Sequence, residues 1–175
     1  MVTAVAVVAA VTTADDRDER FTGYAQARVR VEHADGVLVV RPRAVGTTVG
    51  PFPFDAPVHV LTAHDPGPAR LSAAENAARQ AALEARLHAE GVATWPALAG
   101  AEDGAHAERS ALVVGLTDAR ARALAAAWGQ DAIFRWSATA WSILPCDRAD
   151  PLHLGWELGR EAQRSSASIS GGTPA

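Results

Sequence analysis

The stretch over residues 58–79 constrains the fold of this chain most, because it reads as a strand, a polar loop and a capped helix in direct succession. Residues 58–63 form a short apolar run of strand length. Ser72 followed by Glu75 has the spacing of a capping box, in which each residue satisfies a backbone N–H of the other. The sequence therefore predicts a strand over 58–63 and a helix over 72–90.

Other segments give weaker but readable signals. Two β-like runs flank an Asp35-Gly36 turn signal, which predicts a hairpin. The proline-rich segment 42–57 is expected to be a loop, with Phe52 and Phe54 folding back over the edge of the core. The remaining expected elements are a short helix after the charged run 15–20, strands over 92–98, 110–115, 132–136 and 140–144, a helix over 118–128, and a short final helix over 152–160. Because the strand over 92–98 contains a proline, it is expected to lie at a sheet edge or to be irregular.

From residue 58 the expected order is strand, helix, strand, strand, helix, strand, which is the split β-α-β order of ferredoxin-like sandwiches. With the N-terminal hairpin added, the sequence predicts an α+β fold, a mostly antiparallel sheet with two main helices on one face. A chain of 175 residues is most simply one domain. We assign it to residues 15–160, after an N-terminal extension over 1–14 and before a Ser/Gly-rich tail over 161–175 that is predicted to be disordered.

Composition excludes several classes of function. The net charge of −4 argues against nucleic acid as a partner, and no apolar run is long enough to span a membrane. All sixteen basic residues are arginine, which rules out a Schiff-base or P-loop lysine. Cys146 is the only cysteine, so an internal disulfide is impossible and a reducing, cytoplasmic location is expected. The sequence does not reveal a cofactor, an oligomeric state or whether the protein is an enzyme.

Three blocks of polar and turn residues stand close to the predicted strand ends. They are Leu61-Thr62-Ala63-His64-Asp65-Pro66 with Leu71, Ser72, Glu75, Asn76 and Arg79; Asp103-Gly104 with His106, Glu108 and Ser110; and Gly129-Gln130-Asp131-Ala132-Ile133-Phe134. Together they resemble an uncharacterised, mostly bacterial family, domain of unknown function 3293. The first block of that family usually reads Thr-Ala-x-Asn-Pro, and here Asp65 replaces the asparagine. An ionised aspartate only accepts hydrogen bonds, whereas an amide also donates. The resemblance implies no established activity.

A loop that leaves a strand and enters a helix is a common ligand site, because the helix N-terminus offers unpaired N–H groups. The candidate site residues are Thr62, His64, Asp65, Asn76, Arg79, His106, Glu108 and Gln130. We expect a pocket for a small polar, anionic ligand, with Arg79 and the helix N-terminus holding the anionic group and Asn76 and Gln130 orienting it. If chemistry occurs, Asp65 and Glu108 are the candidate catalytic residues, because paired carboxyl groups can divide acid and base roles.

Each candidate also has a purely structural interpretation. Asp65 suits an Asx-turn, Asn76 suits a tie to the preceding loop, and Arg79 suits an ion pair with Glu75. No metal site is predicted, because residues one apart on an extended chain, such as His106 and Glu108, point to opposite sides.

The alternative function is a protein–protein interaction or assembly module without catalytic activity. Its contact surface would be an exposed strand or the loop that carries Phe52 and Phe54.

Overall fold

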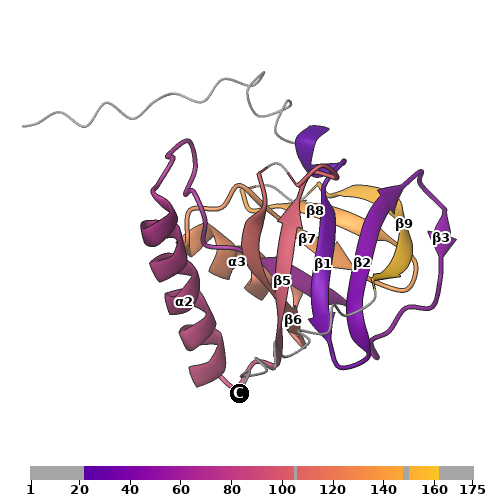
Figure 1. Ribbon diagram of the computed structural model, residues 1–175, viewed down its shortest axis with the longest axis horizontal. Helices are drawn as coiled ribbons and strands as arrows, with labels where there is room; N and C mark the ends of the chain where they lie inside the picture. The colour runs from indigo at the N-terminus through magenta and orange to yellow at the C-terminus, as the bar shows by residue number, and fades with distance from the viewer. Residues whose placement is uncertain (1–21, 105, 148–149, 162–175) are drawn as a thin grey trace, which may run out of the picture.

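The computed structural model describes residues 22–104, 106–147 and 150–161. The polypeptide forms two long helices and nine strands within these residues (Figure 1). In chain order the elements are β1 (Arg28–His33), β2 (Gly36–Arg43), β3 (Thr48–Val49), β4 (Val58–Leu61), α2 (Ala73–Ala89), β5 (Thr94–Gly100), β6 (Glu108–Val114), α3 (Asp118–Ala127), β7 (Ala132–Trp136), β8 (Trp141–Pro145) and β9 (Leu152–Glu161).

Eight of these strands close into a barrel. Their order is β2-β1-β5-β6-β4-β7-β8-β9, and β9 pairs in turn with β2. Every neighbouring pair in this ring is antiparallel. The two-residue strand β3 adds to β9 in parallel, outside the ring. The fold is therefore an eight-stranded closed antiparallel β-barrel.

The prediction of a ferredoxin-like α+β sheet is wrong. The strand and helix order from β4 to β7 is the expected one, but the sheet does not end there. The N-terminal hairpin joins one edge where β1 pairs with β5, and β9 joins the other edge where it pairs with β8. Pairing of β2 with β9 over seven residue pairs then removes both edges.

Two local predictions fail for the same reason. The segment expected as a helix over 152–160 is strand β9, because pairing with β2 and β8 outweighs its local pattern. Strand β5 was expected at an edge or irregular, yet it pairs with both β1 and β6. Pro96 has no backbone N–H to donate. It is accommodated because the pairing with β1 covers Ala97 to Gly100 and does not include Pro96.

The other predicted elements are confirmed where the structure describes them. The β1–β2 hairpin forms, and Ser72 caps α2 through a complete capping box with Glu75. Thr117 caps α3 by accepting a hydrogen bond from the backbone N–H of Arg120. Residues 22–24 are helical, whereas most of the predicted first helix, the extension over 1–14 and residues 162–175 lie outside the described residues.

Strand alternation divides the core into two parts. Val58 and Val60 of β4 point into the barrel, while Leu61 belongs to a second cluster that lies between the barrel wall and the helices. Both helices pack against the same side of the barrel (Figure 1). His59 also faces this layer, where its Nε2 lies 2.8 Å from Oδ1 of Asp118 and links β4 to α3.

Aromatic side chains fill one end of the barrel. Phe52 packs against Trp136 with ring centroids 5.2 Å apart, and Trp136 packs against Trp156 at 5.4 Å. Phe54 contacts Trp95 and Trp136 at 5.6 and 5.7 Å. The expectation that Phe52 and Phe54 fold back over the core is confirmed. We call these five residues the aromatic plug.

In the part of the chain that the structure describes, no helix is both long and apolar enough to cross a membrane.

Candidate functional site

A cavity of about 750 Å³ opens at the end of the barrel opposite the aromatic plug. Strand β7 runs from one end of the barrel to the other: Ala132 at its start lines the cavity, and Trp136 at its end belongs to the aromatic plug. The cavity is lined by the segment before β1, the β4–α2 loop, the first turns of α2, the β5–β6 loop and the α3–β7 loop. Its volume lies in the range of about 300–1,000 Å³ that is typical of small-molecule sites.

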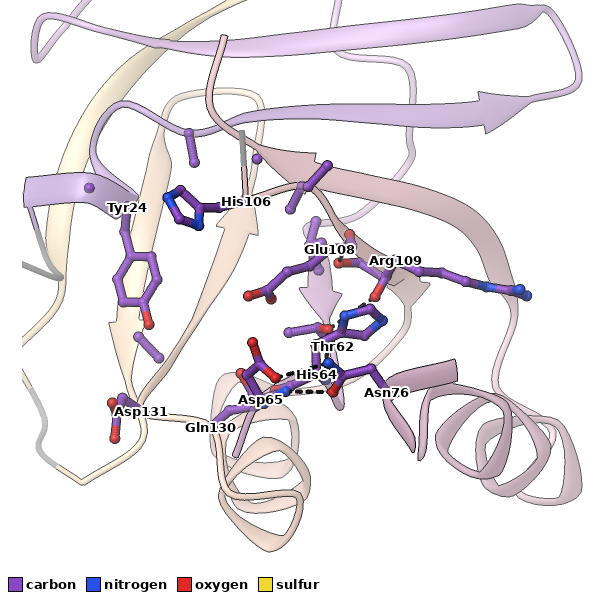
Figure 2. Close-up of a pocket in the computed structure, with 18 of the residues that line it drawn as sticks. Tyr24, Thr62, His64, Asp65, Asn76, His106, Glu108, Arg109, Gln130 and Asp131 are labelled. Carbon is purple, nitrogen blue, oxygen red and sulfur yellow. Dashed lines mark hydrogen bonds between the residues drawn. The ribbon is translucent and has the colours of Figure 1, made fainter. Parts of the chain in front are cut away.

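Antiparallel pairing explains why these loops meet. Strand β4 lies between β6 and β7, and both neighbours run opposite to it. The end of β4 therefore lies beside the starts of β6 and β7, which brings together the three sequence blocks identified above. Figure 2 shows candidate residues from all three blocks around one space.

Asp65 and Asn76 hold each other by reciprocal hydrogen bonds. The Asp65 N–H donates to Oδ1 of Asn76 at 2.9 Å, and Nδ2 of Asn76 donates to Oδ1 of Asp65 at 2.9 Å. The Leu71 N–H also donates to Oδ1 of Asp65 at 2.9 Å. These bonds support a left-handed backbone conformation at Asp65, where φ is 34°. Asn76 is therefore a tie to the loop, and both residues also line the cavity.

The second oxygen of Asp65 has a different environment. Its Oδ2 lies 4.0 Å from Nη1 of Arg70, whose side chain is 74% exposed. The Asn76 amide, followed by the Leu71 N–H, lowers the pKa of Asp65 because both hydrogen bonds favour the charged carboxylate. Asp65 is therefore ionised at neutral pH, with one oxygen used by the loop and the other facing the cavity.

Glu108, at the start of β6, shows the opposite shift. Its half-buried side chain lines the cavity, and within the described residues no hydrogen bond to its carboxyl group is formed. Burial raises the pKa of Glu108, the negative charge of Asp65 raises it further, and Arg70 and His106 oppose the shift. In Figure 2 the carboxyl groups of Glu108 and Asp65 point toward the same space.

Three more candidates line the cavity while bracing its loops. Thr62 donates from Oγ1 to the Arg109 carbonyl at 3.0 Å and accepts from the His64 N–H at 3.1 Å. Gln130 donates from Nε2 to the His64 carbonyl at 2.6 Å, which joins the α3–β7 loop to the β4–α2 loop. Burial lowers the pKa of His64, so its imidazole is neutral at pH 7. His106 lies exposed on the β5–β6 loop at the rim.

Arg79 is the one candidate that does not line the cavity. Its Nε donates to the Ala63 carbonyl at 2.8 Å and its Nη2 to the Trp128 carbonyl at 2.6 Å, with the guanidinium 5.4 Å from the centroid of the Trp128 ring. It braces the end of β4 against the end of α3 and makes no ion pair with Glu75, which serves the capping box. The main reason for expecting an anionic ligand is therefore lost.

Sequence reasoning missed the apolar wall of the cavity. Tyr24, before β1, meets Phe134 of β7 edge to face, with ring centroids 6.1 Å apart and planes at 89°. Val60 and Ile143 lie deeper in the barrel and also line the cavity. No local pattern marks these residues as a site, because only closure of the barrel brings residue 24 to residue 134.

Within the described ranges, no group of three or more histidine, cysteine, aspartate or glutamate side chains is arranged to hold a metal ion.

The fold and the site together define a small β-barrel protein with a cavity at one mouth that has an apolar wall and polar residues from three loops. Residues 61–133 match the family model described as "Protein of unknown function (DUF3293)", which confirms the resemblance predicted from the residues. The matched segment runs from the end of β4 to the start of β7 and contains all eight candidate residues. Neither the curated proteins nor the solved structures gave a match.

Proposed function

We propose that the cavity at the barrel mouth binds a small molecule and that Asp65 and Glu108 form an acid–base pair acting on it. The observation that carries the proposal is a cavity in which two neighbouring carboxyl groups have pKa values shifted in opposite directions. Such divergence is characteristic of sites where one carboxyl group donates a proton and the other accepts one.

The roles follow from the surroundings of each group. Glu108 keeps its proton to a higher pH than an exposed glutamate and therefore serves as the general acid. Asp65 remains a carboxylate, and its Oδ2 serves as the base or as a hydrogen-bond acceptor for the ligand. In a proton transfer, the acid O–H of Glu108 gives its proton to the ligand, and Asp65 accepts a proton from the ligand or from a water between them.

The loops that bear these groups are held before any ligand arrives. Asn76 fixes Asp65, Gln130 fixes the carbonyl of His64, and Thr62 fixes the start of the same loop. A site held in this way spends little binding free energy on ordering itself.

The alternative, an interaction module without catalytic activity, has less support. Phe52 and Phe54, which were to provide its contact surface, pack inside the aromatic plug. Barrel closure pairs both edges of the main sheet and, among the described strands, leaves only the short strand β3 at an edge.

A thermal-shift screen tests the proposal. Purified protein would be melted with nucleotides, sugar phosphates, amino acids, amines and divalent metals. A ligand at one hundred times its dissociation constant should add about 2.7 kcal/mol of stability. Ala73→Trp would obstruct the cavity from the first turn of α2 and should abolish the shift.

Ala78→Trp is the matched control, because Ala78 is exposed on the same helix and does not line the cavity. A bound compound should then be followed by mass spectrometry for conversion, which Glu108→Gln should abolish even at compound concentrations that saturate the variant. A screen in which no compound raises the melting temperature would overturn the pocket. A ligand that binds equally well to both tryptophan variants would place the site elsewhere.

A further inference from the structure

We infer that the ligand of the cavity is a protonated amine attached to an apolar, aromatic body. This inference rests on the proposed function, since it names the ligand class of the same cavity. It reverses the expectation of an anionic ligand, and it follows from the charges and the wall of the cavity taken together.

Three acidic side chains line the cavity, together with two arginines, Arg70 and Arg109. Asp65, Glu108 and Asp131 all line the cavity and come from three different loops or strand starts. The carboxylate of Asp65 supplies a negative charge at this mouth, over an apolar floor where a low dielectric strengthens its effect on a ligand. An anionic ligand would be repelled by the Asp65 carboxylate, whereas a cation would be attracted to it.

The neighbouring arginines do not neutralise this lining from within. Arg109 directs Nε and Nη2 to the carboxylate of Glu84, at 3.2 and 2.9 Å, on the outer side of β6. Arg70 approaches Asp65 only to 4.0 Å and is largely exposed to solvent. Arg79 is bound to two backbone carbonyls away from the cavity. Arg70 and Arg109 therefore line the cavity without forming a hydrogen bond to the acid–base pair, which leaves these two carboxyl groups available to a cationic ligand.

The unused acceptors suit an ammonium group. Oδ1 of Asp65 already accepts two hydrogen bonds, but Oδ2 accepts none from the described residues, and neither does the carboxyl group of Glu108. An ammonium group has three N–H donors and no acceptor, so it can bond to both carboxyl groups at once. Charge-assisted bonds of this kind are about twice as strong as neutral ones.

The apolar wall defines the rest of the ligand. Tyr24 and Phe134 form an edge-to-face pair over a floor that includes Val60 and Ile143. A flat ring can pack against these side chains, and aromatic faces also attract a cation placed within about 6 Å. A highly charged polyamine would leave this wall without a partner, so we favour an amine with one ring and a short linker.

The test compares molecules that differ only in the head group. Calorimetric titration at pH 7 would use 2-phenylethylamine, 2-phenylethanol and 3-phenylpropionate, with methylamine for the head group alone. We expect 2-phenylethylamine to bind at least tenfold more tightly than the alcohol, and the carboxylate and methylamine to bind more weakly than either. Asp65→Asn and Glu108→Gln should each weaken binding of the amine about tenfold and weaken binding of the alcohol much less.

Glu32→Gln, an exposed change on β1, is the matched control and should alter neither affinity. Circular dichroism would confirm that each variant is folded. If Asp65→Asn does not fold, Glu108→Gln alone tests the inference. The inference is overturned if the alcohol or the carboxylate binds as tightly as the amine, if both carboxyl variants bind the amine like wild type, or if no probe binds. If the thermal-shift screen still finds a ligand that Ala73→Trp excludes, these results contradict the inference and not the proposed function. If that screen finds no ligand, both are contradicted.

Discussion

Asp65 and Glu108 face the same cavity, but their surroundings affect a negative charge in opposite ways. Two hydrogen bonds to Oδ1 stabilise the carboxylate of Asp65, whereas burial and the charge of Asp65 penalise that of Glu108. Asn76 is the residue on which this difference depends, because it bonds to both the backbone and the side chain of Asp65. Removing either Asn76 or the charge of Glu108 should therefore have measurable and opposite effects on stability.

Asn76→Ala should lower the free energy of unfolding by about 2 kcal/mol, because loss of the buried amide leaves the Asp65 N–H without its acceptor and Oδ1 of Asp65 with only the Leu71 N–H. Urea denaturation followed by circular dichroism measures the change. Arg86→Ala, an exposed substitution on the same helix, is the control and should cost less than about 0.5 kcal/mol. A loss below that value for Asn76→Ala would show that the loop holds Asp65 by other means.

Glu108→Gln should stabilise the protein at neutral pH. The pKa of Glu108 is raised in the folded state, so protonated Glu108 favours folding. This contribution to the free energy of unfolding is fully present below the unfolded pKa of about 4.3 and is lost as pH rises through the folded pKa. The neutral glutamine avoids that loss. The melting temperature of the variant should match wild type near pH 4 and exceed it progressively toward pH 8.

Asp65, Arg70 and His106 are the charged or titratable groups that act on Glu108, so the same series should be repeated at high salt. Glu32→Gln, exposed on β1, serves as the control and should show no such pH-dependent gain. A difference between Glu108→Gln and wild type that stays constant from pH 4 to pH 8 would contradict the assigned shift.

At the scale of elements, the cavity depends on how closely two loops approach each other. The Gly67 N–H donates to the Gly129 carbonyl at 2.8 Å, which joins the β4–α2 loop to the end of α3. Gly129 adopts a φ of +81°, and a Cβ at this position would lie 2.6 Å from Cβ of Pro66. Glycine is therefore needed both for the helix end and for the contact between loops.

Gly129→Ala should destabilise the protein by about 2–4 kcal/mol, the sum of left-handed strain and a steric clash. Gly91→Ala provides a matched control at the end of α2, since its φ is +70° and no atom lies within 4 Å of the added Cβ. It should cost only about 1–2 kcal/mol. Equal losses in urea denaturation would mean that the Pro66 contact yields without cost.

At the scale of the molecule, one end of the barrel is filled and the other is open. Large aromatic side chains occupy the plug, while small and polar residues surround the cavity mouth. Strand β9 closes the ring and supplies Trp156 to the plug, so the final strand contributes both hydrogen bonds and packing.

Trp156→Ala should reduce the free energy of unfolding by about 3–5 kcal/mol, because it leaves a large void among rings that stay in place. Near-UV circular dichroism should also lose intensity as the ring contacts disappear. Leu152→Ala changes an exposed residue of the same strand and should have little effect. A loss below about 1 kcal/mol for Trp156→Ala would show that the plug repacks.

The local sequence determined the elements whose signals are short in range. The Ser72–Glu75 capping box, the Asp35-Gly36 turn and the Thr117 cap each involve residues a few positions apart, so their chemistry is readable before folding. The same is true of the polar blocks at the end of β4, in the β5–β6 loop and after α3, whose residues line one cavity. The asparagine tie was likewise among the interpretations that the sequence left open.

Only the tertiary structure decided how the sheet ends and which way each polar side chain turns. Residue 37 pairs with residue 161, and residue 31 pairs with residue 97, through hydrogen bonds that no local pattern encodes. Arg79 turns to two carbonyls rather than to the cavity because barrel closure places those acceptors beside it. Local propensity acts within a few residues, whereas edge pairing and cavity walls depend on segments that meet only when the barrel has closed.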